Sequence, residues 1–275
     1  MLAAQLQKYG FQIDFVDPPK IPIKNLKNPS FVITSSVSSF FKGSYDIVHA
    51  FNVPSAFAMK VARAKKRVLS IHGVFSDQVN ALHSSTLSGI AGATEQNVLK
   101  WADALTTDSK ASQKTYKEKL GLDFAYMPSP IDTTKFQDLG EVEKKENQIA
   151  YVGRDSYEKG IDILRQIEPK INGTVVYSTN LPWKEAMRII KSSSIVVVPS
   201  RMESLPTVVK EAFYLKVPVI ANAVGGIPEL VIDGNTGILV PPENPDKLLD
   251  QINSLLQDKE YAKKLADAAY DFVVN

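Results

Sequence analysis

Short apolar runs alternate with helical patterns along almost the whole sequence, and this alternation restricts the fold more than any other feature. The runs are rich in β-branched residues, which is typical of strands covered on both faces. Strands separated by helices pair in parallel, so the sequence predicts an α/β protein with parallel sheets. We expect strands at 11–17, 31–35, 45–50, 67–71, 104–108, 124–127, 149–153, 174–178, 195–199, 217–222 and 237–240, and helices near 1–9, 54–64, 92–101, 110–120, 158–167, 182–192, 206–215, 245–257 and 258–273.

A polar stretch near the middle of the chain separates two α/β runs of similar size. Residues 135–148 include a run of mixed charge from Glu141 to Glu146, which is typical of an exposed linker. We therefore expect one Rossmann-like domain over residues 1–140 and a second over 141–275. Two such domains would bind ligands in a cleft where the carboxyl ends of their parallel sheets face each other.

The scarce residue types exclude several kinds of chemistry. The chain has no cysteine, which rules out disulfides, thiolate catalysis and thiolate metal sites. Its three histidines, His49, His72 and His83, are too few to predict a zinc site made of several histidines, and His83 is expected in a loop. No segment has the roughly 18 to 20 apolar residues that span a bilayer, and no signal-peptide pattern is visible. We expect a cytoplasmic protein.

The net charge of +2 is unevenly distributed along the chain. Residues 1–72 contain ten Lys and Arg against three Asp and Glu, so this part carries +7 and the remainder −5. A basic first half could face a phospholipid surface, a polyprenyl phosphate or nucleic acid, or its lysines could simply be solvated. Nucleic acid is not predicted as a partner, because the basic residues lack interleaved aromatic residues.

The segment 198–212 holds the densest group of candidate site residues. A buried strand is followed there by a helix that is expected to start near Pro206, with Ser204 as its N-cap. The N–H groups of the first helical turn would then be available to phosphate or sugar oxygens. Glu203 lies just before the helix and Glu211 within it, so both can face one site. Spacing alone leaves open that Glu203 only caps the helix and that Glu211 is solvated.

Two basic residues follow the expected strand at 149–153. Arg154 comes directly after the strand, and Lys159 lies five residues later beside a helix start. Both could reach a diphosphate at the edge of the sheet, the guanidinium as a planar fork and the ammonium as a point charge. Taken alone, these two residues are also common surface features.

Together these motifs resemble the retaining glycosyltransferases of family 4, which have the GT-B fold. The match is densest over residues 199–242, where the order and the distances of the motifs agree with the family. The matching pieces there are Pro199-Ser200, Glu203, Glu211-Ala212, 218–221, 225–230 and 234–242. Weaker matches extend over most of the chain, at 46–49, 70–73, 102–109, 128–132 and 151–160.

The resemblance implies a role for each candidate residue. Glu211 would bind the ribose hydroxyls of the nucleotide, and Glu203 would bind the transferred hexose. Arg154 and Lys159 would neutralise the leaving nucleoside diphosphate. His72 would contact the hexose from the first domain, whereas His49 either lines the acceptor cleft or has no direct role. The implied nucleotide-binding residues are Gly153, Ser204, Leu205, Pro206, Thr207 and Glu211.

The implied reaction moves a hexose from a UDP- or GDP-linked donor to an acceptor hydroxyl with retention of anomeric configuration. No Asp-x-Asp pair is present to hold a divalent metal, so we expect no metal and no cofactor besides the donor. The acceptor could be a glycan, a lipid or a small molecule, and the basic first half could contact a membrane peripherally. A GT-B nucleotide-sugar 2-epimerase and a non-catalytic sugar-nucleotide-binding protein remain as alternatives.

Three departures from the family pattern concern the arrangement of the chain. The first ten residues read as the first helix of the family, so we expect the first N-terminal strand and its glycine-rich loop to be missing. The final crossover helix is expected to be missing as well. Between Gly160 and Ile195 there is room for one strand–helix unit fewer than usual.

Overall fold

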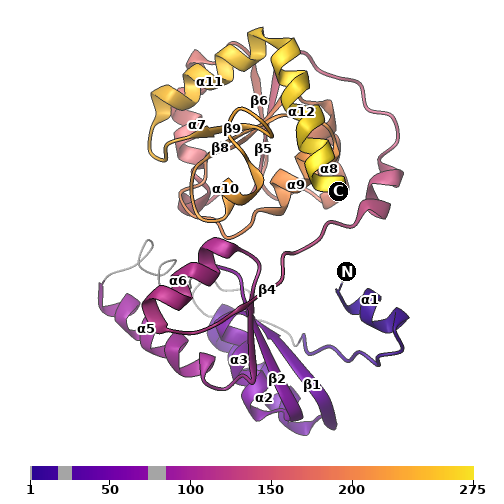
Figure 1. The fold of residues 1–275 in the computed structure, drawn as a ribbon, viewed down its shortest axis with the longest axis vertical. Helices are drawn as coiled ribbons and strands as arrows, with labels where there is room; N and C mark the ends of the chain where they lie inside the picture. The colour runs from indigo at the N-terminus through magenta and orange to yellow at the C-terminus, as the bar shows by residue number, and fades with distance from the viewer. Residues whose placement is uncertain (1, 18–26, 74–84) are drawn as a thin grey trace. The chain divides into compact units, whose positions relative to one another are not determined.

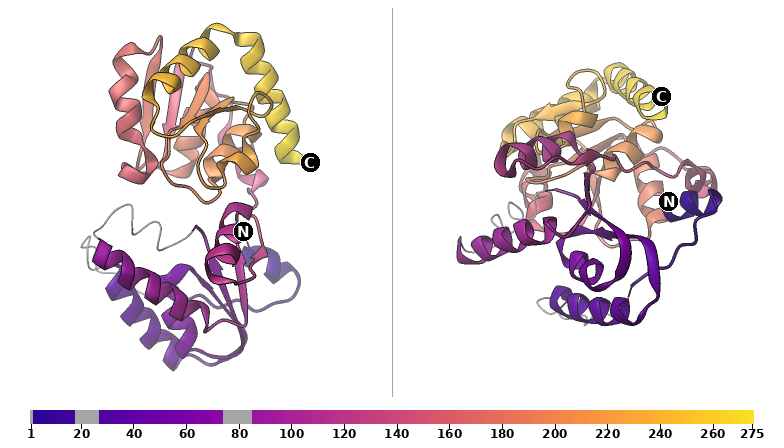
Figure 2. Two further views of the ribbon diagram at one scale, coloured as in Figure 1. Left: turned by 60° about the vertical axis from the view of Figure 1, so that its left-hand side comes forward. Right: turned by 60° about the horizontal axis from the view of Figure 1, so that its bottom comes forward.

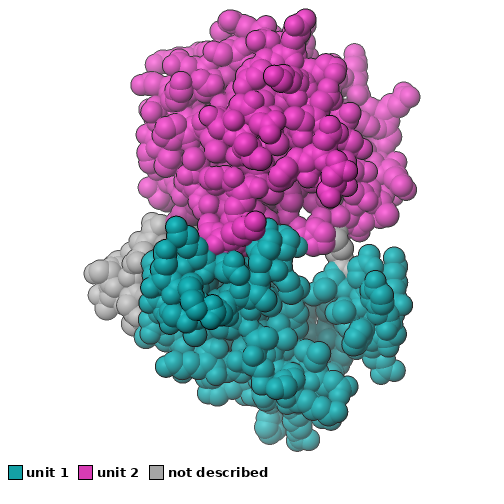
Figure 3. Space-filling view, in the orientation of Figure 1, with its two compact units in different colours: residues 1–108, 112–128 teal, residues 109–111, 129–275 magenta. Residues whose placement is uncertain are grey.

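The computed structural model describes residues 2–17, 27–73 and 85–275, and His83 lies outside the described residues. The chain divides into two compact units (Figure 3). Unit 1 comprises Met1–Asp108 and Ser112–Pro128, and unit 2 comprises Ser109–Ala111 and Ser129–Asn275. Each unit contains one parallel sheet, which confirms the predicted α/β class.

Unit 1 is built on a four-stranded parallel sheet in the order β1-β2-β3-β4. Its buried core lies between this sheet and the helices that follow the strands, and it includes Met59, Leu69, Ile71 and Tyr116. The expected strands at 45–50, 67–71, 104–108 and 124–127 are confirmed. The elements are α1 (Leu2–Lys8), α2 (Lys27–Phe41), β1 (Ser44–Phe51), α3 (Asn52–Val61), β2 (Arg63–Ile71), α5 (Ser85–Leu99), β3 (Ala104–Thr107), α6 (Lys110–Leu120) and β4 (Ala125–Tyr126).

Two strand predictions in unit 1 are wrong. Residues 11–17 form no strand, and the side chains of Phe11 and Phe15 are exposed. Residues 31–35 belong to the helix α2, where the hydroxyls of Thr34 and Ser35 donate to carbonyls three or four residues earlier. A short apolar run is consistent with either a strand or a helix, and its length must decide between them.

Unit 2 is built on a five-stranded parallel sheet in the order β6-β5-β7-β8-β9. All five strands that were expected after residue 148 are confirmed. They are β5 (Gln148–Val152), β6 (Thr174–Ser178), β7 (Ile195–Val198), β8 (Val219–Asn222) and β9 (Ile238–Val240). Most of their residues are buried, as expected for strands with helices on both faces.

Helices cover both faces of the unit 2 sheet (Figures 1 and 2). One core cluster contains Met187, Phe213 and Ala269, and the other contains Leu164 and Ile252. The five helices expected in this half are confirmed, although the first of them begins as a separate 3-10 turn. The elements are η1 (Thr133–Leu139), η2 (Tyr157–Lys159), α7 (Ile161–Ile167), η3 (Glu168–Lys170), α8 (Trp183–Ser192), α9 (Thr207–Tyr214), α10 (Ile227–Leu230), α11 (Pro245–Gln257) and α12 (Lys259–Val274).

Candidate functional site

The strand order of unit 2 creates a switch point between β5 and β7. From β5 the chain continues through α7 to β6 on one side, whereas from β7 it continues through α9 to β8 on the other side. The two connections leave the carboxyl edge of the sheet in opposite directions, and α/β proteins bind ligands at such a switch point. Arg154 and Lys159 follow β5, and Glu203 and Glu211 follow β7.

Lys159 and Glu203 form an ion pair at this switch point. The Lys159 Nζ lies 2.7 Å from Glu203 Oε1, and the Ser200 hydroxyl donates to the same oxygen at 2.9 Å. The Glu203 side chain is only 8% exposed and that of Lys159 23%. A carboxylate at such a depth needs a charged partner, so each residue fixes the position of the other.

The loops after β5 and β7 are held together by Arg201. Its backbone N–H and that of Met202 donate to the Glu158 carbonyl at 2.9 and 3.2 Å. Its guanidinium donates to both carboxylate oxygens of Asp162, at 2.7 and 2.8 Å, and lies 4.0 Å from the ring centre of Tyr157. No local sequence pattern indicates this role for Arg201, because its partners lie some forty residues away along the chain.

Glycines allow three loops to approach one another closely at this edge. Gly160 has a φ of 64°, and a Cβ placed there would lie 1.9 Å from the Pro199 carbonyl oxygen. Gly225 has a φ of 53°, and its Cβ would lie 1.8 Å from the Glu203 carbonyl oxygen. Both positions therefore need glycine for the conformation and for the space. At the neighbouring Gly226, a Cβ would lie 2.0 Å from the Ser204 carbonyl oxygen.

Arg154 does not join the Lys159–Glu203 pair. Its side chain is 71% exposed, and its guanidinium pairs with Glu158 at 2.9 Å. The Gly153 N–H donates to the Ser178 carbonyl at 3.1 Å, so it extends the sheet. Arg154 thus follows β5 at the carboxyl edge of the sheet, and its long side chain is largely exposed. The Gly153 N–H, in contrast, is already bonded to the Ser178 carbonyl.

Glu211 is held by an aromatic donor rather than by a cation. The Trp183 indole N–H donates to Glu211 Oε1 at 2.8 Å. Burial raises the pKa of the Glu211 carboxyl, while the Trp183 hydrogen bond and the charges of Lys210 and Lys135 act in the opposite direction. No local sequence pattern connects Trp183 with Glu211, since the two residues are 28 positions apart.

The start of α9 differs in one respect from the prediction. The N-cap position is occupied by Pro206, whose side chain makes no capping hydrogen bond. Ser204 is therefore not the N-cap, and the corresponding prediction is wrong. The Leu205 side chain is buried, and Thr207 is the first helical residue. The first amides of a helix have no partner within the helix, so an anionic or sugar oxygen can accept from them.

The two other candidate residues belong to unit 1. The His72 Nδ1 lies 2.8 Å from Asp108 Oδ2, just after the end of β2. His49, on β1, lies with its Nε2 2.6 Å from the Ser70 hydroxyl. Burial, followed by the charge of His72, lowers the pKa of His49 and favours its neutral form. The Phe51 ring stacks on both imidazoles, at centroid distances of 4.3 and 6.1 Å.

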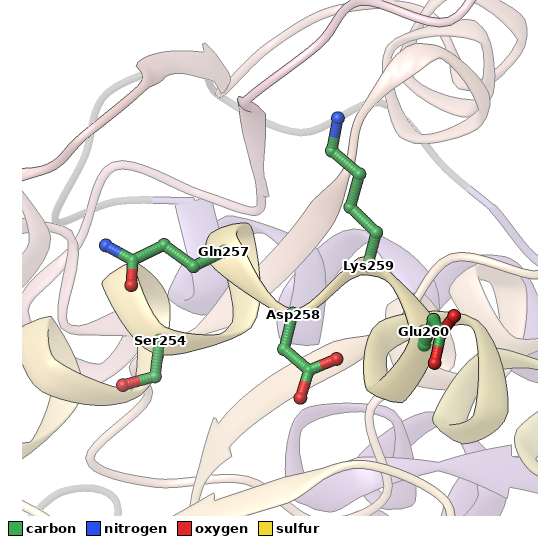
Figure 4. A pocket seen from close by; sticks show the side chains of 5 residues that line it. All are labelled: Ser254, Gln257, Asp258, Lys259 and Glu260. Atoms are coloured by element: carbon green, nitrogen blue, oxygen red, sulfur yellow. The ribbon is translucent and has the colours of Figure 1, made fainter.

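A surface hollow of unit 2 lies away from these residues. Lys259 on its wall pairs with Glu146, two residues before β5 begins, so the hollow lies near the amino edge of the sheet. Asp258 accepts from the Tyr261 N–H and caps α12. This hollow is not part of the candidate site. Its lining residues, shown in Figure 4, are Ser254, Gln257, Asp258, Lys259 and Glu260.

Within residues 2–17, 27–73 and 85–275, no group of three or more His, Cys, Asp or Glu side chains is arranged to hold a metal ion. None of the helices described there has the length and apolar character needed to cross a membrane.

Comparison with known proteins agrees with this architecture. Residues 168–272 match the family model of group 1 glycosyl transferases, and residues 3–135 match that of glycosyltransferase family 4. An uncharacterised glycosyltransferase of Methanocaldococcus jannaschii is 26% identical over 271 residues, covering 82% of this chain and 70% of that protein. Shorter matches at 37% and 38% identity span only 21% and 26% of the length of the curated relatives concerned.

Solved structures of other proteins align with nearly the whole of this chain. Sucrose-phosphate synthase of Thermosynechococcus elongatus has a TM-score of 0.76 at 20% identity, covering 94% of this chain and 77% of that one. HepE of Anabaena in complex with UDP-glucose has a TM-score of 0.69 at 17% identity, covering 98% and 83%. The chain thus has the GT-B fold of two parallel-sheet α/β domains. The two halves of the chain each match a glycosyltransferase family model, and these matches do not favour the epimerase or non-catalytic alternatives.

Proposed function

We propose that the chain transfers a hexose from a nucleoside-diphosphate sugar to an acceptor hydroxyl with retention of configuration. The observation that carries this proposal is the partly buried Lys159–Glu203 pair at the switch point of the unit 2 sheet. A carboxylate can accept hydrogen bonds from sugar hydroxyls, and the adjacent ammonium can neutralise a diphosphate. HepE, whose structure contains UDP-glucose, offers a precedent within the fold.

Each residue has a distinct task in this proposal. Glu203 binds hydroxyls of the transferred hexose, and Glu211 binds the ribose. Lys159 neutralises the diphosphate, and the exposed Arg154 side chain swings towards the same group. The segment from Ser204 to Thr207, with the amides at the start of α9, completes the contact with the donor. Gly153 contributes only the absence of a side chain beside the donor, because its N–H is already bonded.

Breaking the anomeric C–O bond leaves the electron pair and negative charge on the departing diphosphate. Fixed cations and amides stabilise that charge in a partly dry site without reorganising, so we propose a metal-independent reaction. The acceptor hydroxyl forms its bond to the anomeric carbon on the same face, and its proton passes to the diphosphate. We also propose that His72, oriented by Asp108, contacts the hexose, and that His49 lines the acceptor side.

The proposal is tested by binding of the donor. Uridine, guanosine and adenosine diphosphate sugars are screened for a shift in thermal midpoint, which a ligand of the native state must raise. We expect at least one, linked to UDP or GDP, to stabilise the wild-type protein, with or without a chelator. Glu211→Ala should abolish the shift, because the ribose loses its acceptor. Equal stabilisation of the wild type and of Glu211→Ala would argue against the assignment.

A peripheral membrane contact through unit 1 is a separate proposal. Helix α2 turns Ser35 and Ser39 inward and leaves Ile33, Val37 and Phe41 more than half exposed. The sequence of residues 1–72 carries a net charge of +7, which favours binding to an anionic lipid surface. We expect the protein to sediment with phosphatidylglycerol vesicles and not with phosphatidylcholine vesicles, and Phe41→Ser to weaken the binding about threefold or more. Equal sedimentation with both vesicles would contradict the proposal.

A further inference from the structure

We propose that Trp183 is a positioning residue that holds the Glu211 carboxylate ready for the ribose hydroxyls. Trp183 is the first residue of α8 and Glu211 lies in α9, and the indole N–H donates to Glu211 Oε1 at 2.8 Å. The inference rests on the proposed role of Glu211, and it assigns a second residue to the same task. Nothing in the motif 199–212 points to Trp183, which precedes that motif by a whole strand.

The indole selects the form of Glu211 that can bind a diol. An indole N–H can only donate, so it stabilises an accepting carboxylate and not a donating carboxylic acid. One bond to Oε1 leaves the remaining lone pairs of the carboxylate for two vicinal hydroxyls. Without this bond, the Glu211 side chain would still be largely buried, and burial raises its pKa. The side chain would then more readily become a neutral carboxylic acid.

The indole ring is itself fixed by its surroundings. Its plane meets the Phe136 ring edge-on, with centroids 5.0 Å apart at 82°. Phe136 in turn packs against Tyr214 of α9, at 4.6 Å. The Lys135 ammonium lies 5.9 Å from the indole centre. A phenyl ring at position 183 could make the same apolar contacts, so the polar N–H is the feature that packing alone does not need.

The consequence is a preference for ribose over 2′-deoxyribose. A buried carboxylate that is held in its accepting form loses a charge-assisted hydrogen bond when the 2′-hydroxyl is absent. Once the indole N–H is removed, the carboxylate can rotate or take up a proton, and the difference between the two sugars should shrink. The charged groups that act on Glu211 are Lys210 of α9 and Lys135 of η1, and both remain in the variant.

The test compares Trp183→Phe with Trp101→Phe, the same substitution at the other tryptophan. Trp101 belongs to unit 1, where it packs on Phe57. Titration calorimetry gives the Kd of UDP, GDP and their 2′-deoxy counterparts at pH 6 and pH 8. For the base that binds, we expect Trp183→Phe to lose about tenfold in affinity and most of its ribose preference, with Trp101→Phe matching the wild type.

The affinity for the nucleotide is expected to fall as the pH drops. Glu211 must be ionised to accept, so affinity is full above its pKa and falls as the pH drops through it. Removing the Trp183 hydrogen bond raises that pKa further, so the loss of affinity on going from pH 8 to pH 6 should be larger in Trp183→Phe. A change that only loosened packing would weaken ribose and deoxyribose nucleotides alike, at both pH values.

A second measurement covers the case in which Trp183→Phe does not fold. In the Trp101→Phe protein, Trp183 is the sole tryptophan of the 275 residues, and its emission should change when the nucleotide engages Glu211. An unchanged emission in a protein that binds the nucleotide, or unchanged Kd and ribose preference in a folded Trp183→Phe, would overturn this inference alone. If none of the nucleotides binds the wild type, the proposed function fails and the inference fails with it.

Discussion

Replacing Lys159 by methionine is expected to lower kcat for sugar transfer about 10²–10³-fold. By analogy with the loss of one oxyanion donor, removal of a preorganised cation should raise the barrier by roughly 2.7–4 kcal/mol. Methionine keeps much of the length of the side chain and loses the charge. The substitution also removes the charged partner of Glu203, whose side chain is only 8% exposed. At Oε1 the hydrogen bond from the Ser200 hydroxyl remains. The sugar contact should therefore weaken together with the phosphate contact.

The experiment measures kcat and KM for transfer from the donor identified by the thermal screen. Lys247→Met, an exposed lysine near the start of α11, is the matched control and should behave as the wild type. Lys159→Arg should keep part of the activity, because the charge is retained while the geometry of the pair changes. A Lys159→Met enzyme within about threefold of the wild type would mean that this ammonium does not act on the leaving group.

The substitution Gly160→Ala should have the largest effect on stability. A left-handed backbone conformation costs a non-glycine residue roughly 1–2 kcal/mol. A Cβ only 1.9 Å from the Pro199 carbonyl oxygen must in addition push the loops after β5 and β7 apart, since backbone cannot rotate away as a side chain does. We expect a total loss of about 3 kcal/mol or more, together with loss of donor binding.

A matched control separates the two contributions. Gly121 has a φ of 67°, and nothing lies within 4 Å of a Cβ placed there. Gly121→Ala therefore carries the backbone cost without the collision, and it should lower the thermal midpoint less and leave nucleotide binding intact. Because the two units can unfold separately, the transition of each must be resolved before midpoints are compared. Equal destabilisation by Gly160→Ala and Gly121→Ala would show that the loops yield to the extra methyl group.

Much of the fold could be predicted because the strands of unit 2 are short, apolar and β-branched, with clear breaks between them. Residues 31–35 were assigned incorrectly, since a run such as Phe-Val-Ile-Thr suits a strand as well as a helix. The serines at 30, 35 and 39, which are buried, form the inner side of α2, and this pattern appears only over a longer window. Residues 11–17 have the pattern of a strand but are not paired in the structure.

The candidate site was harder to predict than the strands. The motif spacing placed Lys159 and Glu203 at one sheet edge, and the structure brings them into contact, although their roles stay predictions. Arg154 was expected beside them, but its side chain extends towards Glu158. Trp183 and Arg201 were not expected at all. Their contacts depend on how α8, α9 and the η2 turn pack, which no local pattern in the sequence encodes.

The glycine contacts at the sheet edge have a consequence for how a ligand is captured. Gly160 and Gly225 let the segments after β5 and β8 rest directly on the backbone of the segment after β7. Because these segments are already packed on one another, few of their residues have to become ordered when a ligand binds. The conformational entropy lost on association should therefore be small. Within this half of the protein, the rate of capture would then be limited by diffusion and orientation rather than by rearrangement of loops.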